Sequence, residues 1–292
     1  MADTPADGDV FAVSRLHDPA LIRTFLNGPE DMDRARYAYM IGDLSAPYWE
    51  QAAFYGAFAP AADLRAVLLY YQPITPPPVI SAGDAAAIAA IWPQVLADFD
   101  PRRLVYHAQT EHLPVIARFF AMPAPMAMWR MAITRPALAM PTADSAGQTR
   151  RLTAQDVADV QALFDSGAAA DFMDGRPHVT PALLEGAPFF GHFHADQLLA
   201  IAGTHIVSPA EKLGSVGYVF THPAARGHGY AQLVTAAVTR ELFAAGLNLV
   251  TLNVKQENAP AVRAYERIGY RRDSALWEGI AIRHDPAPFN DE

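Results

Sequence analysis

Residues 217–231 read Gly-Tyr-Val-Phe-Thr-His-Pro-Ala-Ala-Arg-Gly-His-Gly-Tyr-Ala, and this stretch decides the fold. It predicts a short β-strand that Pro223 interrupts, followed by a glycine-rich turn. From Gly229 a helix is predicted up to Gly246, because apolar residues recur four apart at Val234, Val238 and Leu242. A strand, a glycine turn and a helix in this order indicate an anion site, since the first N–H groups of a helix have no intrahelical partner.

The glycine turn predicts a ligand that carries phosphate. Gly227 and Gly229 allow the backbone to close around such a group, and Arg226 adds a charged hydrogen-bond donor. Glycines two apart are also common in ordinary turns, so this interpretation depends on the rest of the chain.

The whole chain has the composition of a folded protein with room for two domains. It contains 292 residues, of which 51% are hydrophobic, with a formal net charge of −9 and no cysteine. The acidic net charge and the absence of a basic stripe argue against a nucleic-acid partner. The sequence contains no run of about 18 apolar residues, so no membrane-spanning helix is expected. The ten histidines include no His-x-x-x-His pair, so no metal site is expected. The acidic N-terminus does not resemble a secretory signal, which favours a cytoplasmic location.

The first half, residues 1–134, mixes predicted strands and helices and is interpreted as one domain. Strands are predicted at 10–16, 52–58, 64–71, 103–108 and 125–133, and helices at 18–26, 29–40, 81–98 and 110–120. The prolines at 76–78 are predicted to end the hairpin, which excludes a central strand there. Residues 135–148 hold two prolines among small residues and are predicted to be a linker.

The second half, residues 149–292, is predicted to be a second domain. Thr153 and Asp156 form a loose capping box before a helix that ends near Phe164. Further strands are predicted at 150–152, 188–194, 198–208, 212–221, 247–254, near 270 and at 278–283, and further helices at 182–184, 229–246 and 260–268.

The two halves resemble each other at a constant offset of 146 residues. The matched pairs are Gly83 with Gly229, Ala85 with Ala231, Leu104 with Val250, Glu111 with Glu257, Pro114 with Pro260, Ile116 with Val262, and Phe119 with Tyr265. Two residues further along, 127–129 match 275–277, each ending in tryptophan. We interpret the halves as two copies of one fold.

The first copy lacks the residues that would bind a phosphate in the second copy. At the positions aligned with Arg226, Gly227 and Tyr230, the first copy has Ile80, Ser81 and Asp84. A carboxylate at a helix start repels a phosphate, and the guanidinium is missing there. His112 replaces Asn258, and Phe119 lacks the hydroxyl of Tyr265. The second copy is therefore predicted to carry the function and the first to be degenerate.

Two motifs of the second copy resemble the GNAT N-acetyltransferase superfamily. Residues 226–231 fit the acyl-CoA pyrophosphate loop, Gln/Arg-x-x-Gly-x-Gly/Ala, and residues 252–270 resemble the second signature of the superfamily through Asn258, Ala261, Tyr265 and Gly269. The resemblance covers about residues 149–284, and it is nearest to the subfamily related to glycine acyltransferases. It implies an α/β (α+β) fold of two tandem GNAT-like domains, each with a mixed, mostly antiparallel central sheet and helices on both faces.

The resemblance also implies an acyl-CoA-dependent N-acyltransferase that moves acetyl from acetyl-CoA to a small-molecule amine, as a monomer or a homodimer. In such enzymes the strand before the loop parts from its neighbour and pairs with the pantetheine arm. The implied cofactor-binding residues are Val219, Phe220, Thr221, Arg226, Gly227, His228, Gly229, Tyr230, Ala231, Asn253 and Asn258.

Tyr265 has two interpretations. Its helical spacing to Ala261, Ala264 and Ile268 is typical of a core aromatic residue. The resemblance instead implies a catalytic acid that protonates the departing thiolate, which phenol and thiol pKa values allow. We favour the catalytic role.

The base that removes a proton from the amine is not determined by the sequence. The candidates are His222, His192, His194, His205, Asp171, Asp174 and Glu185. Residues 166–188 are expected to shape the acceptor pocket, lined by Phe172, Met173, Phe189 and Phe190. Arg176 with His178 would hold an anionic group, which indicates an amino-acid-like amine, but the same residues are equally typical of an ordinary loop and core.

Two other functions compete with the acyltransferase. A non-catalytic acyl-CoA-binding or regulatory module is the alternative, because one copy has already lost the motif. A dinucleotide-binding domain fits poorly, since Gln232 stands where that motif needs Gly or Ala.

Overall fold

The computed structural model describes residues 11–27, 34–141, 147–168 and 177–284. The chain forms two compact units: unit 1 comprises Met1–Asp31, Ala46–Met126 and Leu276–Glu292, and unit 2 comprises Met32–Ser45 and Ala127–Ala275. Each unit therefore takes segments from both halves of the sequence. The linear division at residues 134 and 149 stays an interpretation of the repeat, and the compact units are assembled differently from it.

In unit 1 the strand order is β1 (Ala12–Leu16), β2 (Ala52–Ala59), β3 (Asp63–Tyr71), β4 (Pro78–Gly83), β5 (Arg103–Ala108) and β13 (Arg271–Arg283). Strands β4 and β5 pair in parallel, whereas the other neighbours in this order pair antiparallel. The short strand β6 (Phe120–Ala121) also pairs with β13.

In unit 2 the strand order is β8 (Gln148–Arg151), β9 (Phe190–His194), β10 (Gln197–Ser208), β11 (Leu213–Thr221), β12 (Leu249–Lys255) and β7 (Met126–Thr134). Here β11 and β12 pair in parallel, and the other neighbours pair antiparallel.

The two units therefore share one strand order and one position for the parallel pair. The sixth strand of each unit comes from the half of the sequence that forms most of the other unit. Strand β7 precedes the other strands of unit 2 in sequence but pairs with β12, and β13 comes last in sequence but pairs with β5 of unit 1. This agrees with the match of residues 127–129 to 275–277, since those stretches lie on equivalent strands.

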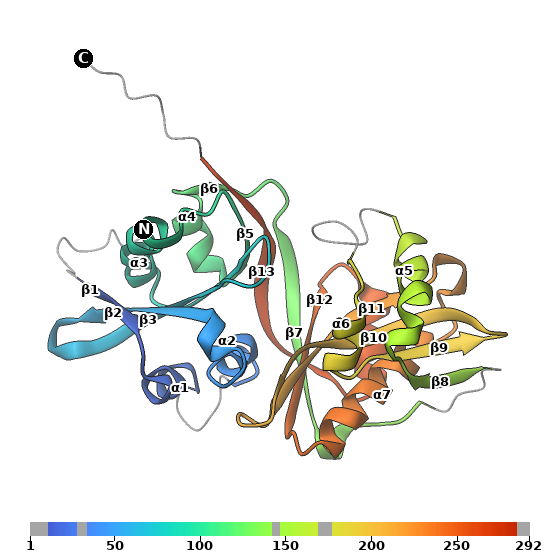
Figure 1. Ribbon diagram of the computed structural model, residues 1–292. Helices are drawn as coiled ribbons and strands as arrows, with labels where there is room; N and C mark the ends of the chain where they lie inside the picture. Colours follow the sequence, from blue (N-terminus) through green and yellow to red (C-terminus); the bar gives the residue numbers. More distant parts are fainter. Residues whose placement is uncertain (1–10, 28–33, 142–146, 169–176, 285–292) are drawn as a thin grey trace. The chain divides into compact units, whose positions relative to one another are not determined.

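The core of unit 1 forms where helices cover its sheet (Figure 1). Helix α3 (Ala85–Phe99) buries Ile88, Ile91 and Trp92, and α4 (Leu113–Ile116) buries Val115 and Ile116 in the same cluster. Helix α1 (Pro19–Asn27) buries Ile22 and Leu26.

In unit 2 helices cover both faces of the sheet (Figure 1). Helices α7 (Tyr230–Ala244) and α8 (Ala259–Arg267) share one core with β12 and β7, and we call this side the α7 face. Helices α5 (Val157–Asp165) and α6 (Pro181–Gly186) form a second core with β10 and β11, on the α5 face. The capping box before α5 is confirmed, because Asp156 accepts the backbone N–H of Thr153 at 2.8 Å.

Helix α2 (Ala38–Gly42) belongs to unit 2 although it lies in the first half of the sequence. Gly42 permits this packing, because a Cβ there would lie 2.6 Å from the Ile206 side chain of β10. The predicted helix at 29–40 is thus shortened to this segment, and its residues 29–33 lie outside the described part of the chain.

Strand β4 corrects the prediction for the proline triplet. It begins at Pro78 and lies between β3 and β5, where we expected no central strand. A proline is tolerated as the first residue of a strand, and the carbonyl of Pro77 accepts the N–H of Val105. The helix predicted from residue 81 therefore starts at Ala85, and the helix predicted at 110–120 is reduced to α4 after one turn of 3₁₀-helix.

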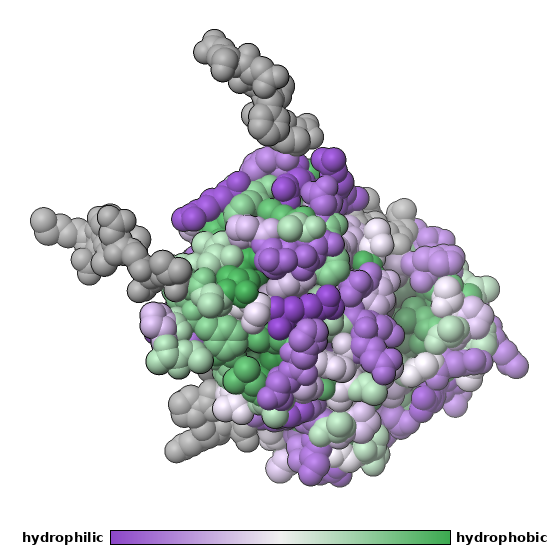
Figure 2. Space-filling model, turned by 60° about the vertical axis from the view of Figure 1, so that its left-hand side comes forward, coloured by the Kyte–Doolittle hydropathy of each residue, from purple (hydrophilic) through white to green (hydrophobic). Residues whose placement is uncertain are grey.

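The surface carries mixed side chains. Figure 2 shows hydrophilic residues spread over the visible face, with hydrophobic areas between them. Among the described residues, no helix is long and apolar enough to cross a membrane, and no group of three or more His, Asp or Glu residues is placed to hold a metal ion.

Candidate active site

Strands β11 and β12 part in the middle of unit 2. They pair from Leu213 with Leu249 to Val216 with Leu252, and both strands then continue without pairing to each other. Each stays attached on its outer side, since Thr221 still pairs with Ala200 of β10 and Lys255 with Met128 of β7. The parting leaves backbone N–H and C=O groups on the facing edges of both strands, and an extended ligand that contains amides can pair with such edges.

A β-bulge marks the point where the strands part. Against β10, the register shifts between the pairs Gly203–Gly217 and Ile201–Phe220. Tyr218 within this bulge has a positive φ of 53°, which is uncommon for a bulky residue and is stabilised by its surroundings. Sequence reasoning missed Tyr218, because a positive φ at a residue other than glycine leaves no trace in the sequence.

The turn after β11 leads directly into the start of α7. Gly227 and Gly229 have φ of 88° and 81°, and a Cβ at either position would meet nothing within 4 Å. The glycines are thus required by backbone conformation, and the space beside them is open. Gly229 is the N-cap of the 15-residue helix α7, whose first N–H groups have no intrahelical acceptor.

Side chains on this turn hold its shape. The Nε of Arg226 donates to the carbonyl of Thr221 at 3.4 Å, and its guanidinium lies 5.8 Å from the Phe220 ring centre. His228 stacks on Tyr230 with ring centres 5.6 Å apart, and Tyr230 stacks on His192 at 4.4 Å. The turn therefore presents backbone N–H groups and an exposed arginine toward solvent, a combination suited to binding pyrophosphate.

The other predicted cofactor residues occupy different positions. Val219 packs against the core of the α7 face, whereas Phe220 is buried on the α5 face. Asn258 accepts the backbone N–H of Ala261 at 3.2 Å and so caps α8. Asn253 lies on β12 beyond the parting, opposite Arg130 of β7.

Tyr265 is buried in the core of the α7 face, with 6% of its surface exposed. The residues that flank the parting, Val216 and Leu252, belong to the same core. Burial raises the pKa of Tyr265, so its phenol stays protonated and is a weaker acid than a free tyrosine. Tyr265 is therefore a core residue, as its helical spacing predicted, and its catalytic role stays a proposal.

Among the base candidates, His205 is the one next to the bulge. A Cβ on Gly217 would lie 2.1 Å from its imidazole, so the ring lies directly over the β11 backbone. Its ring centre is 4.7 Å from that of Tyr218.

The other histidine candidates are engaged elsewhere. His222 accepts the N–H of Ala224, and His192 is buried, contacts Thr149, and has a pKa lowered by desolvation. His194 is exposed at the end of β9, and Glu185 is exposed on α6. Asp171 and Asp174 lie outside the described residues.

The predicted pocket residues separate to opposite faces. Phe189 is buried on the α5 face with its ring 5.3 Å from Tyr218, and a Cβ on Gly203 would lie 2.1 Å from it. Phe190 instead belongs to the core of the α7 face, because adjacent residues of a strand point to opposite sides. His178 is exposed, and Phe172, Met173 and Arg176 lie outside the described residues.

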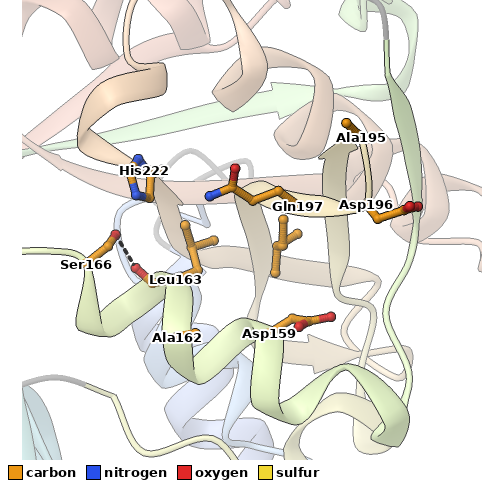
Figure 3. A pocket seen from close by; sticks show the side chains of 9 residues that line it. Asp159, Ala162, Leu163, Ser166, Ala195, Asp196, Gln197 and His222 are labelled. Atoms are coloured by element: carbon orange, nitrogen blue, oxygen red, sulfur yellow. Dashed lines mark hydrogen bonds between the residues drawn. The ribbon is translucent and has the colours of Figure 1, made fainter.

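An open pocket of about 420 Å³ lies beside α5, at the outer end of β11. Figure 3 shows Asp159, Ala162 and Ser166 on the helix, opposite His222 and the turn at Ala195 and Asp196. Ser166 is turned back to its own helix, where it donates to the carbonyl of Leu163 at 2.6 Å. None of the predicted cofactor residues lines this pocket, so the parting of β11 and β12 defines the candidate site.

In unit 1 a buried histidine links the end of β4 to the start of α4. His112 is fully buried, with Nδ1 2.8 Å from the Ser81 hydroxyl and Nε2 2.8 Å from the Gly83 carbonyl. These bonds join Ser81 and Gly83 at the end of β4 to His112, which precedes α4. Desolvation lowers the pKa of His112, which favours a neutral ring in this position.

Unit 1 also lacks the glycine turn itself. Strand β4 ends at Gly83 and α3 begins at Ala85, whereas residues 222–229 separate β11 from α7. The predicted gapless alignment is therefore wrong at Ile80 and Ser81, which are strand residues and have no loop counterpart. Asp84 at the start of α3 is paired with Arg65 at 2.5 Å.

Comparison with known sequences gives one family match. Residues 159–270 match the sequence model of the Acetyltransferase (GNAT) family. A mycothiol acetyltransferase of Streptomyces scabiei is 35% identical over 100 residues, which are 34% of this chain and 30% of that protein. Another, from Gordonia bronchialis, is 41% identical over 61 residues, which are 21% of this chain and 20% of that protein. The alignments thus span less than a third of these curated relatives.

Solved structures share the fold over nearly the whole chain. A GCN5-related N-acetyltransferase from Sphaerobacter thermophilus has a TM-score of 0.62 at 14% identity, covering 94% of this chain and 97% of that one. A tandem GNAT protein from the clavulanic acid biosynthesis pathway has a TM-score of 0.56 at 13% identity, covering 95% and 100%. The GNAT-like fold in two domains is confirmed, and the GNAT superfamily is supported. The predicted position near glycine acyltransferases is not confirmed, since the curated relatives named above are mycothiol acetyltransferases.

Proposed function

We propose, from the support for the GNAT superfamily, that this chain is an acyl-CoA-dependent N-acyltransferase that transfers acetyl from acetyl-CoA to the amine of a small molecule. The reaction is assigned to unit 2. The observation that carries the proposal is the parting of β11 from β12 immediately before a glycine turn and the start of α7.

The residues of unit 2 suit acetyl-CoA in two places. The turn at residues 226–231 supplies backbone N–H groups and the Arg226 side chain for the pyrophosphate. The facing edges of β11 and β12 supply backbone groups for the amide-containing arm, with Val219 and Thr221 on one side and Asn253 on the other. Asn258 would contribute mainly by fixing the start of α8, since its side-chain oxygen already caps that helix.

The proposed chemistry is direct attack of the amine on the thioester. The neutral amine nitrogen forms a bond to the carbonyl carbon, the carbon–sulfur bond breaks, the nitrogen gives up one N–H proton to become an amide, and the thiolate takes up one proton, so that the N–H proton lost replaces the one that the thiolate gains. His205, over Gly217 beside the bulge, accepts the proton that the ammonium group must lose before it can attack. Tyr265 supplies a proton to the thiolate, and its raised pKa makes this transfer depend on the thiolate being formed close to the phenol.

Release of free thiol from acetyl-CoA tests this function. Purified protein is mixed with acetyl-CoA and with amino acids, polyamines or small peptides, and thiol release is followed over time. An amine that raises release above the rate with acetyl-CoA alone supports the acyltransferase. Binding of CoA by calorimetry without any amine-dependent release would contradict it and favour an acyl-CoA-binding module.

A further inference from the structure

Arg130 on β7 is a buried cation, and within the described part of the chain it forms no ion pair with a carboxylate. Only 2% of its surface is exposed, and its Nε and Nη1 have no hydrogen-bond partner among the residues that the structure describes. Its guanidinium carbon lies 4.3 Å from the centre of the Tyr39 ring of α2. The ring face attracts the positive charge but cannot accept the N–H bonds that point along the guanidinium plane.

Such an arrangement is costly in a protein interior. A buried charge needs an opposite charge or hydrogen bonds to replace the lost water, and buried guanidinium groups are normally paired. Unpaired buried polar atoms therefore indicate a missing partner. A bound ligand is one such partner.

The equivalent position in unit 1 shows what a filled arrangement looks like. Arg130 faces Asn253 across β7 and β12, and Glu278 faces His107 across β13 and β5. The repeat relates these pairs, since 253 − 107 = 146 and 278 − 130 = 148, the two offsets found in the sequence. In unit 1 the two side chains contact each other: His107 Nδ1 lies 2.9 Å from Glu278 Oε1, and both side chains are largely buried. In unit 2 a cation faces a neutral amide, and the anion is absent from the pair.

The arginine lies on the side of the sheet where the bulge presents its aromatic rings. Neighbours Leu252 and Val254 of β12 point to the α7 face, so Asn253 and the opposite Arg130 point to the other face. Ring contacts connect Arg130 with the bulge: Tyr39 lies 6.3 Å from His205, and His205 lies 4.7 Å from Tyr218.

We infer that Arg130 binds a carboxylate of the acceptor, which is therefore an amine that also carries a carboxylate group. The inference rests on the proposed function for the reaction at the amine. One guanidinium balances one negative charge, and the adjoining Tyr39 and Asn253 are neutral, which favours a carboxylate over a doubly charged phosphate.

The inference gives the first half of the sequence a part in the active unit. Arg130 comes from β7 and Tyr39 from α2, both of which precede residue 135 but belong to unit 2. The copy that lost its own cofactor turn thus supplies the residues that select the acceptor.

Acceptor kinetics with matched pairs test the inference. Each amino acid that the protein acetylates is compared with its amide, which lacks the negative charge. For the wild type we expect kcat/KM to be at least about tenfold higher for the acid, and for Arg130→Met we expect this ratio to fall to about one. Arg130→Lys, which keeps the charge and loses the planar fork, should retain part of the preference. Arg272→Met is the matched control, because that arginine also lies over an aromatic ring in unit 2, that of Trp129, but is exposed at the surface.

Thermal unfolding without substrate separates selection from structure. Since Nε and Nη1 of Arg130 have no hydrogen-bond partner among the described residues, Arg130→Met should unfold at a temperature no lower than the wild type. A lower unfolding temperature, with equal loss of rate for acids and amides, would show a structural role and overturn the inference.

The carboxylate site can also be tested if the proposed acetyltransferase activity is not found. If the wild type acetylates no amine, the same acids and amides are titrated calorimetrically into the protein saturated with CoA. Binding of acids that Arg130→Met abolishes would support the carboxylate site even so, and equal binding of acids and amides would refute it.

Discussion

The imidazole of His205 lies so close to Gly217 that one added methyl group must displace it. In Gly217→Ala the new Cβ would be 2.1 Å from the ring, whereas ordinary contact begins at 3.4 Å, so the imidazole must move by at least 1.3 Å (3.4 − 2.1). If His205 accepts the proton from the amine, a displacement of about 1 Å can lower kcat by about 100-fold. The added methyl group is also expected to cost roughly 1–3 kcal/mol of stability through overpacking.

Gly203→Ala is a matched control for this variant. Its Cβ would also lie 2.1 Å from a ring, that of Phe189, on the neighbouring strand β10. Similar overpacking is therefore expected, but the imidazole is not the group that moves. We expect kcat of Gly203→Ala to fall much less than that of Gly217→Ala, since the group that it displaces, Phe189, transfers no proton.

The assay combines thiol release with thermal unfolding by circular dichroism. The unfolding temperatures of the two variants should fall by similar amounts, while kcat should fall mainly in Gly217→Ala. Equal losses of kcat in both variants would refute the reasoning, because they would follow from overpacking alone. His205→Gln, which removes the base without filling any space, should reproduce the loss of kcat with little change in unfolding temperature.

Three further predictions follow from single side chains. Tyr265→Phe should lower kcat and leave the affinity for CoA nearly unchanged, and an unchanged kcat would exclude Tyr265 as the acid. Because burial raises the pKa of Tyr265, ionisation of its phenol should not limit the wild-type rate at mildly alkaline pH. Arg226→Gln should weaken CoA binding in calorimetry by about tenfold, as loss of a charge-assisted hydrogen bond does, whereas Arg272→Gln should not. Burial raises the pKa of Asp43 from 3.8 to about 8, so ionising this carboxyl lowers stability progressively from about pH 4 to pH 8. Asp43→Asn should therefore unfold like the wild type near pH 4 and at a higher temperature at pH 9, where its free energy of unfolding should exceed that of the wild type by at most roughly 6 kcal/mol (8 − 3.8, at about 1.4 kcal/mol per pH unit). Parallel pH profiles of the two proteins would contradict this.

Local patterns predicted most of the elements correctly. The helix from Tyr230 to Ala244, the hairpin of β9 and β10 and the capping box at Thr153 all depend on residues near one another in the chain. The prediction for Pro78 was wrong because the rule against proline in a central strand does not apply to the first residue of that strand.

The candidate site was predictable only in part. The turn at 226–231 is a contiguous motif, so its glycines and arginine were identified from spacing alone. Tyr218 was missed because its strained backbone depends on the bulge against β10. His205 was one candidate among several, and its place over Gly217 depends on the register of two strands.

By itself, the sequence determined the order of the elements, the position of the glycine turn and the existence of two related halves, because these are properties of neighbouring residues or of a constant offset. Only the tertiary structure decided which half completes which unit. Strand β7 pairs with β12 and α2 packs on β10, so Arg130 and Tyr39 from the first half lie in the unit that carries the glycine turn. The physical reason is that strand pairing and burial act between residues that are distant in the chain, and a pattern within one segment does not specify its partner.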